Sequence, residues 1–425
     1  MEFLNHEQKM VFKHLKNGKN VFITGQAGTG KTYTLNIICQ WAKDNQYRIG
    51  KTSTTGISAL LIGGQTIHSW SGIGIVDNES TKYDILYKVR RNQTAVSNWC
   101  LTKILIIDEI SMLNPWIFEL LDFIGRELRQ SSKPFGGIQI VLTGDFAQLP
   151  PIDSTFVFES KIWDKSIDEI VYLKKNMRQK DPIFQRILTE IRLGNVTDES
   201  VKILESRVNY KFLNSEIQPT KLYSYRRTVQ SINNESLSKL LREGNELITY
   251  NSNDEIFTKE KLTDKQIQYY KNKLNKTCQY PKQLNICIGC QVLLLTNLNL
   301  KSGLCNGSRG IVVKFHNSRP VVKFRNGIQT VIDHSIQEIK INPKTSVTRS
   351  QIPLVLAYAI TIHKSQGSSL DCAQIDIGRE IFTHGQAYVA LSRIRSLQDL
   401  SLTDFNWKKI TVHPKVLNFY KKLES

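Results

Sequence analysis

Short apolar runs alternate with helix-like segments over the first 150 residues of the chain. Each run is rich in β-branched residues and ends at a Gly, Asp or Thr, where a loop can begin. We expect strands at 20–24, 49–53, 103–107 and 139–143. Strands that alternate with helices are typical of a parallel α/β domain, and such sheets bind ligands beyond the carboxyl ends of their strands. The unusual residues of this sequence lie at those ends.

The pattern changes further along the chain. Residues 72–100 interrupt the alternation with a polar, basic segment that we interpret as an insertion. Apolar spacing predicts a helix over 181–193, and the Lys-, Asn- and Gln-rich stretch 251–282 predicts a solvated helix or loop. Short β runs with Gly and Asn turns over 284–341 predict a small barrel-like insert, after which strand and helix alternate again.

Composition and charge narrow the class of protein. The 425 residues carry 57 Lys+Arg against 38 Asp+Glu, a formal charge of +19, and 40% of them are hydrophobic. That apolar fraction excludes a wholly disordered chain, and the charge favours a polyanionic partner such as nucleic acid. The longest apolar run, 352–362, is too short to span a membrane, and the N-terminus resembles neither a signal nor a transit peptide. We therefore expect a cytoplasmic or nuclear protein that is not secreted and contacts no membrane.

The cysteines allow two interpretations. There are seven of them, which is an odd number, and the sequence shows no secretory signal. Both observations indicate reduced thiols. Four lie close together in the sequence and include a C-x-x-C spacing: Cys278, Cys287, Cys290 and Cys305. One interpretation is a zinc site, although the second pair lacks finger-like spacing. The other, which we prefer, makes Cys287 and Cys290 small core residues of one buried strand over 284–293.

The strongest chemical signal is the segment 25–32, which reads G-x-x-x-x-G-K-T. It follows an expected strand and opens an expected helix, the context in which such a loop binds phosphate. Its glycines let backbone N–H groups approach phosphate oxygens, and the helix N-terminus adds partial positive charge. We expect Lys31 to reach the β- and γ-phosphates and the Thr32 hydroxyl to hold Mg²⁺.

Two further segments supply carboxylates and an amide. Four apolar residues lead into Asp108 and Glu109, so a buried strand presents two acids at its end. We expect Asp108 to bind Mg²⁺ through its coordination shell, and Glu109 to orient or deprotonate the attacking water. The segment 142–151, LTGDFAQLPP, ends a strand at Thr143 and projects Gln148 toward the sheet edge. Its amide there can contact both a γ-phosphate and the attacking water.

The order of these segments resembles superfamily-one helicases of the RecD-like class, and within them the Pif-type DNA helicases. The motifs that carry the resemblance run almost end to end, at 25–32, 54–59, 64–69, 108–109, 144–151, 176–179, 304–310, 351–367 and 385–393. Departures are modest: Ser369 stands where the family usually has Thr, Cys287 where a basic residue is common, and 5–8 is a compact Gln motif. Residues 236–283 match least, so no function is carried over to them.

The resemblance assigns roles to further residues of the nucleotide site. Gln8 would read adenine and favour ATP, while Gln366 and Gly367 lie in the loop that couples nucleotide to the DNA strand. Arg178 and Arg393 would act as arginine fingers from the second α/β domain. Without the resemblance, Arg178 reads as part of a solvated basic cluster. The expected cofactors are ATP and Mg²⁺, with the phosphates held by Gly25, Gly28, Thr29, Gly30, Lys31 and Thr32.

Nucleic-acid contacts also follow from the resemblance. A single-strand channel combines basic groups along the backbone with aromatic or apolar groups against the bases. The residues whose positions fit such roles are Thr55, Gly56, His68, Ser69, Trp70, Asn306, Arg309, His363 and Lys364. Taken alone, His68 reads more simply as a core histidine. The 72–100 insertion resembles the wedge element that splits a duplex in this family.

The implied fold is α/β, with two RecA-like P-loop NTPase domains, a small wedge insert and a small SH3-like β-barrel insert. The expected bounds are 1–165 for the first motor domain, 166–235 with 345–425 for the second, and 236–344 for the barrel-containing insert. The implied function is a monomeric ATP-dependent DNA helicase that moves 5′ to 3′ on single-stranded DNA. Its expected substrates are forked or tailed duplexes, RNA–DNA hybrids and G-quadruplexes. Two other classes stay open: a protein-remodelling P-loop ATPase, and a DNA-binding protein with a relic nucleotide site.

Overall fold

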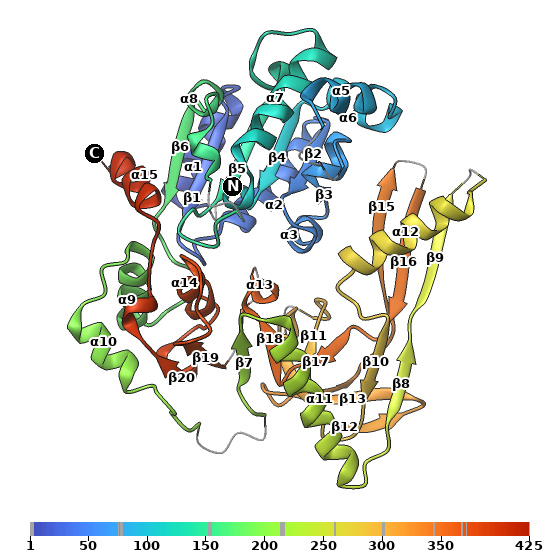
Figure 1. Cartoon of the computed structure of the whole chain (residues 1–425), viewed down its shortest axis with the longest axis vertical. Coiled ribbons are helices and arrows are strands. Elements are labelled where there is room, and N and C mark those ends of the chain that lie inside the picture. Colours follow the sequence, from blue (N-terminus) through green and yellow to red (C-terminus); the bar gives the residue numbers. More distant parts are fainter. Residues whose placement is uncertain are drawn as a thin grey trace. The chain divides into compact units, whose positions relative to one another are not determined.

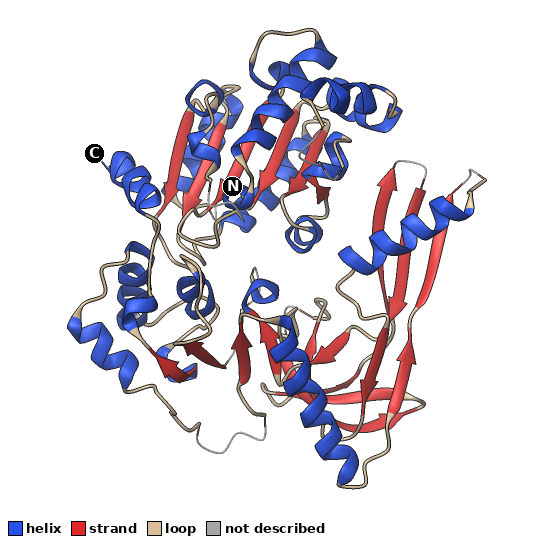
Figure 2. Ribbon diagram, viewed as in Figure 1, coloured by secondary structure: helices blue, strands red, loops and turns tan. Residues whose placement is uncertain are grey.

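The chain forms two compact units, Met1–Arg178 with His413–Ser425, and Gln179–Val412 (Figures 1 and 2). The computed structural model describes residues 4–74, 76, 80–151, 155–212, 217–258, 261–299, 302–342, 345–366, 369–370 and 372–424. Of residues 57, 60, 340, 342, 364 and 424 it describes the main chain only. No helix within these ranges is both long and apolar enough to cross a membrane.

A parallel sheet forms the centre of the first unit. Its strands are β1 (Val21–Gly25), β2 (Ile49–Ser53), β3 (Gln65–Thr66), β4 (Ile104–Asp108), β5 (Gln139–Gly144) and β6 (Glu169–Leu173). In the described part of the chain, their order is β3-β2-β4-β5-β1-β6. Strands β1 and β4 are buried throughout, as expected for a parallel sheet covered on both faces. The four strands predicted in this region are confirmed, with bounds that differ by at most one residue.

Helices cover both faces of this sheet (Figure 2). They are α1 (His6–Lys16), α2 (Lys31–Asp44), α3 (Gly56–Leu61), α4 (Ile67–Ser71), α5 (Lys82–Arg90), α6 (Gln93–Leu101), α7 (Pro115–Arg129), α8 (Trp163–Ser166) and α15 (Pro414–Glu424). The segment 72–100, interpreted from the sequence as an insertion, contains α5 and α6; its residues 75 and 77–79 lie outside the described ranges. Helix α6 contacts both α4 and α7.

The first unit extends further along the chain than the sequence suggested. Strand β6 pairs with β1 over its whole length, which carries the sheet beyond residue 165. Helix α15 also belongs here, because the Phe419 ring lies 5.1 Å from that of Phe146 and 6.4 Å from that of Phe22. The sequence placed 166–178 and 413–425 in the second motor domain, whereas strand pairing and aromatic packing place them in the first compact unit.

The second unit combines one parallel sheet with antiparallel ones. Its strands are β7 (Thr220–Tyr223), β8 (Ile248–Asn251), β9 (Asn253–Thr258), β10 (Gln283–Ile286), β11 (Gln291–Leu294), β12 (Arg309–His316), β13 (Arg319–Phe324), β14 (Gln329–Val331), β15 (Ser335–Asn342), β16 (Thr345–Gln351), β17 (Leu354–Leu356), β18 (Ala359–Thr361), β19 (Ala373–Ile377) and β20 (Leu400–Phe405). Its helices are α9 (Pro182–Leu193), α10 (Asp198–Glu205), α11 (Arg226–Arg242), α12 (Asp264–Thr277), α13 (Ile362–Ser365) and α14 (Gln386–Leu391). The sheet orders are β18-β7-β19-β20, parallel, and β14-β13-β12-β11-β17, β15-β16-β9 and β10-β8, antiparallel.

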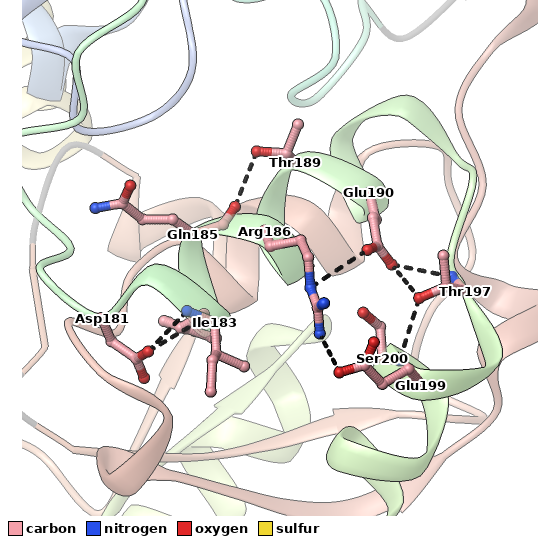
Figure 3. Close-up of polar contacts among 10 residues, drawn as sticks. Asp181, Ile183, Gln185, Arg186, Thr189, Glu190, Thr197, Glu199 and Ser200 are labelled. Carbon is pink, nitrogen blue, oxygen red and sulfur yellow. Dashed lines mark hydrogen bonds and ion pairs between the residues drawn. The ribbon is translucent and has the colours of Figure 1, made fainter.

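The helix predicted over 181–193 is confirmed as α9, and a polar network joins it to α10 (Figure 3). Asp181 caps α9, as its side chain accepts hydrogen bonds from two backbone N–H groups. Glu190 accepts from the N–H and hydroxyl of Thr197, the N-cap of α10, at 3.0 and 2.9 Å. Arg186 pairs with Glu199 over 2.7 Å. Because that pair is exposed, it contributes little to stability, and the capping contacts do more to hold α10 in place.

One strand prediction is wrong. The segment 284–293 does not form a single strand, because β10 ends at Ile286, β11 begins at Gln291, and the two belong to different sheets. Between them Gly289 adopts a φ of +84°, a left-handed conformation that glycine takes without steric cost and that ends an extended run. The Cys290 N–H closes the turn on the Cys287 carbonyl over 3.2 Å.

The cysteines in this turn are core residues, as the preferred interpretation expected. Cys287 and Cys290 are fully buried, with their Sγ atoms 3.5 Å apart. Burial raises the pKa of Cys290 to about 12, so its thiol stays protonated at neutral pH. Within the described ranges, no three His, Cys, Asp or Glu side chains are grouped so that they could hold a metal.

The polar stretch 251–282 is confirmed as helical over α12, whose N-cap Thr263 forms a capping box with Gln266. The sequence missed β9, which precedes α12 and pairs with β16. Helix α12 packs on this sheet through Tyr270 and Leu274. The five-stranded antiparallel sheet lies where the small barrel is expected, and its closure into a barrel stays a prediction.

The Arg349 guanidinium anchors this three-stranded sheet to α12. It is 2% exposed, donates to both carboxylate oxygens of Asp254 at 2.8 and 2.7 Å, and donates to Asn275 Oδ1 at 2.6 Å. Arg349→Met would leave the Asp254 carboxylate without its cation. Since breaking a buried pair destabilises by about 3–5 kcal/mol, we expect a loss of about 3 kcal/mol in the free energy of unfolding, measured by denaturant titration.

The exposed pair Arg319–Asp333 of the same unit provides the matched control. Surface pairs contribute about 0–1 kcal/mol, so Arg319→Met should leave stability nearly unchanged. Equal losses for the two variants would contradict a special role for Arg349.

Candidate active site

The segment 25–32 joins the end of β1 to the start of α2, as predicted. Gly28 and Gly30 adopt left-handed φ values of +91° and +87°. A Cβ at Gly25 would lie 2.5 Å from the Leu173 carbonyl oxygen, so this position admits no side chain. Lys31 Nζ donates to the Gly25 carbonyl at 2.7 Å, which folds the ammonium over its own loop. The loop therefore combines glycines, which carry no side chain over the backbone N–H groups, with a cation, as phosphate binding needs.

Asp108 lies buried at the end of β4, beside this loop. Its Oδ1 accepts hydrogen bonds from the hydroxyl of Thr143, at the end of β5, and from the Glu109 N–H at 2.9 Å. Burial raises the pKa of Asp108, and the Lys31 ammonium opposes that shift, so the two groups are within electrostatic reach. Thr32 is exposed on the first turn of α2. A carboxylate and a hydroxyl are oxygen ligands of the kind Mg²⁺ takes, so these residues fit that ion.

Glu109 follows in a left-handed conformation, with φ +53° and ψ +45°. Non-glycine residues held there are uncommon and cluster at functional sites. Thr54, which follows β2, holds this backbone: its hydroxyl donates to the Glu109 carbonyl at 2.8 Å and its N–H to the Asp108 carbonyl at 3.2 Å. The segment that contains the predicted DNA contact Thr55 is thus bonded directly to the second acid. The sequence placed Thr54 in the motif at 54–59 but did not indicate its bond to Glu109, because this contact spans 55 residues.

Gln148 is buried in the loop that follows β5. Its backbone N–H donates to the Asp145 carbonyl at 3.0 Å. The Asp145 carboxylate is fully buried and accepts from the Ala147 N–H at 3.2 Å and from the Tyr420 hydroxyl at 3.1 Å. Tyr420 lies 275 residues away on α15, an amphipathic helix with no motif, so no local signal could have indicated it.

Gln8 lies beside Gly30, at the end of the loop where α2 begins. Its Nε2 donates to Thr34 Oγ1 at 3.2 Å, and Thr34 in turn donates to the Gly30 carbonyl at 2.9 Å. The Gln8 Oε1 accepts from the Asn5 N–H in a capping box that begins α1. Gln8 is therefore held by hydrogen bonds directly against the first turn of α2.

The segment 176–178 also lies against the phosphate loop. Asn176 Nδ2 donates to the Ala27 carbonyl at 3.2 Å, and the Met177 N–H donates to the Gly28 carbonyl at 2.8 Å. Arg178, a predicted arginine finger, comes directly after these contacts and is the last residue of the first unit. The sequence had assigned it to the second domain.

Other predicted nucleotide contacts belong to the second unit. Arg393 is buried after α14, where its Nε donates to the Val389 carbonyl at 2.9 Å and its Nη2 to Ser392 Oγ at 2.7 Å. Gln366 Nε2 is buried without a hydrogen-bond partner among the described residues. Gly367 lies outside the described ranges.

The predicted DNA contacts fall into two groups. Trp70 is 4% exposed and packs against Trp99 with ring centroids 4.9 Å apart, and Arg309 is buried and donates to the Gln218 carbonyl at 2.5 Å. Both side chains are buried in this structure, so their contact with a DNA strand stays a prediction. The residues with at least partial exposure are Thr55, Gly56, His68, Ser69, Asn306 and His363, while the Lys364 side chain is outside the described part. Burial lowers the pKa of His68, which keeps it neutral.

The structure brings the main predicted nucleotide residues to one sheet edge. Strands β4, β5 and β1 are parallel neighbours, so their carboxyl ends place Asp108, the Gln148 loop and the phosphate loop side by side. Lys31, Thr32 and Glu109 complete this group. A phosphate loop, two acids and an amide at such an edge can bind and hydrolyse a nucleoside triphosphate.

Comparison with known proteins identifies the family. The chain matches the family models "PIF1-like helicase" over residues 3–202 and "DNA helicase Pif1, 2B domain" over residues 269–315. Over 99% of its length it is 36% identical to the ATP-dependent DNA helicase PIF1 of Xenopus laevis, of which it spans 64%.

Solved structures agree with this match. The crystal structure of Pif1 helicase from Candida albicans is 34% identical, with full coverage of both chains and a TM-score of 0.79. Pif1 from Bacteroides in complex with ADP-AlF3 and ssDNA is 27% identical, with 99% of this chain and 97% of that chain covered and a TM-score of 0.65. The resemblance read from the motifs and the RecA-like α/β class are thereby confirmed. The chain belongs to the PIF1-like helicase family.

Proposed function

We propose that this chain is a monomeric ATP-dependent DNA helicase. It translocates 5′ to 3′ on single-stranded DNA and unwinds forked or tailed duplexes, RNA–DNA hybrids or G-quadruplexes. One observation carries the proposal: Lys31, Asp108 and Glu109 lie together at one edge of the parallel sheet, in a chain that belongs to this family. The Bacteroides relative was solved with a nucleotide analogue and single-stranded DNA, and the charge of +19 supports a polyanionic partner.

In the proposed site each residue has one task. Lys31 contacts the β- and γ-phosphates of ATP, which lie on the N–H groups of the loop. Thr32 and Asp108 would hold Mg²⁺, which would supply positive charge beside the phosphates. Glu109 orients the attacking water and accepts its proton, and Gln148 positions that water against the γ-phosphate. The remaining tasks are adenine recognition and charge stabilisation by arginine fingers, carried by Gln8, Arg178 and Arg393.

The DNA-binding part of the proposal rests on partly exposed polar groups. Thr55, Gly56 and Ser69 would hold phosphates through backbone N–H groups and hydroxyls, with His68, Asn306, His363 and Lys364 as further contacts. The Thr54 hydrogen bonds support coupling, because movement of this segment on a DNA strand would act directly on the Glu109 backbone. Residues 72–100 would act as the wedge, and 236–344 as the barrel-containing insert between two parts of the second motor domain.

Strand separation on tailed duplexes tests the proposal. A duplex with a 5′ single-stranded tail should be unwound in ATP and Mg²⁺, and duplexes with a 3′ tail or blunt ends should not. ATP hydrolysis by the monomer should rise on addition of single-stranded DNA. Unwinding from the 3′ tail alone would refute the polarity, and hydrolysis that single-stranded DNA does not stimulate would refute the helicase assignment.

A further inference from the structure

One hydroxyl group, that of Tyr420, joins three segments around the nucleotide site. Tyr420 lies on α15 and is 3% exposed. Its hydroxyl oxygen is 3.1 Å from Asp145 Oδ1, 3.0 Å from the Phe146 N and 3.0 Å from Thr24 Oγ1. Figure 1 shows α15 beside β6, and the Tyr420 and Tyr172 rings are 6.3 Å apart there.

The chemistry of each partner fixes the direction of these bonds. An ionised Asp145 carboxylate only accepts, so the Tyr420 hydroxyl donates to it. The Phe146 N–H only donates, so the phenol oxygen accepts from it. The remaining acceptor position of that oxygen takes the Thr24 hydroxyl, which therefore donates. The hydroxyl thus donates one hydrogen bond and accepts two from these partners.

These partners lie where two loops begin, the phosphate loop and the loop that contains Gln148. Thr24 is the last residue before Gly25, where the phosphate loop begins, and it pairs with Gly144 across β1 and β5. Asp145 and Phe146 follow Gly144 and lead to Gln148, whose N–H bonds the Asp145 carbonyl. The Tyr420 hydroxyl therefore ties the start of the phosphate loop to the start of the Gln148 loop.

Other contacts hold α15 in place independently of this hydroxyl. The Phe419 ring stacks on Phe158 at 4.6 Å. Lys415 forms a short ion pair with Glu159 at the other end of the helix. Loss of the Tyr420 hydroxyl alone should accordingly leave α15 docked, so its effect on the two loops can be measured separately.

We propose that Tyr420 is a positioning residue for ATP hydrolysis. Its hydroxyl fixes the position of the Gln148 loop relative to the phosphate loop. The Gln148 amide can then contact the water that attacks the γ-phosphate. Tyr420 acts through Asp145 and Phe146 rather than on the nucleotide itself. This inference rests on the role proposed above for Gln148.

Tyr420→Phe tests the inference, because it removes the hydroxyl and keeps the ring. We expect kcat for DNA-stimulated ATP hydrolysis, per folded molecule, to fall about 10-fold, since small displacements of a positioned group lower rates by such factors. The KM for ATP should stay within about twofold, because the loop amides and Lys31 that bind the phosphates are untouched. Ile124→Val, a buried change in α7, is the control and should leave both constants unchanged. A lower Tm with unchanged kcat would show a merely structural role and overturn the proposal.

A double-mutant cycle separates this inference from the role of Gln148. In a Gln148→Ala background, Tyr420→Phe should lower kcat little further, because the group it positions is already gone. Independent, multiplying losses would refute a route through Gln148. If Gln148→Ala alone retained full kcat, the role proposed for Gln148 would fail, and this inference with it. If Gln148→Ala were inactive and Tyr420→Phe fully active, the inference alone would fail.

Discussion

Lys31→Ala is expected to abolish both ATP hydrolysis and strand separation, with kcat lower by about 10³-fold, the loss expected when a preorganised charge at a phosphoryl group is removed. The physical reason is that the Lys31 ammonium lies over the phosphate loop. It is close enough to the buried Asp108 to oppose the rise in the pKa of that carboxyl. Its hydrogen bonds to the Gly25 and Gln26 carbonyls, at 2.7 and 3.0 Å, show a side chain folded over the loop. Alanine offers the phosphates no such charge, so ATP affinity should fall as well.

The same helix provides the control for this variant. Lys43 lies exposed in the last turn of α2, so Lys43→Ala removes one charge from α2 without touching the loop. It should hydrolyse ATP like the unmodified chain in a coupled assay with saturating single-stranded DNA. If Lys31→Ala kept DNA-stimulated turnover, the nucleotide site would have to lie elsewhere, and the reading of this chain as a relic-site DNA-binding protein would be revived.

The parts of the site that could be predicted are those encoded locally. Residues 25–32 specify a strand, a glycine turn and a helix start within a few positions, and the acids follow a continuous apolar strand. Because strands of a parallel sheet present their carboxyl ends at one edge, placing these segments together required no knowledge of distant contacts. The pattern of buried strands was enough to predict that these segments lie at the same edge of the sheet.

The parts that could not be predicted depend on partners far along the chain. Trp70 packs against Trp99, and Arg309 donates to the Gln218 carbonyl; both partners lie far from these residues in the sequence. The role of Tyr420 depends on Asp145, a contact that leaves no periodic trace in the sequence. Local signals can also be outweighed: the apolar run 284–293 looks continuous, but the left-handed conformation of Gly289 divides it into two strands.

Glu109→Gln is expected to separate nucleotide binding from chemistry. The amide keeps the size of the side chain and can adopt the same left-handed backbone, but it cannot accept a proton from the attacking water. We expect single-turnover hydrolysis to slow by about 10²–10⁴-fold, the usual contribution of a general base. ATP affinity, measured with a fluorescent analogue, should change little because Lys31 and the loop amides remain. The variant should therefore accumulate with ATP bound.

The contrast with Lys31→Ala makes this expectation specific. Both variants should fail to unwind a 5′-tailed duplex, but only Glu109→Gln should retain bound ATP. Glu127→Gln, in the exposed pair with Arg90 on the same unit, is the matched control and should keep full activity. A Glu109→Gln protein that hydrolysed ATP at the unmodified rate would move the base to another residue. One that failed to bind ATP would show that the Glu109 carboxylate shapes the site, because loss of binding cannot arise from the missing base alone.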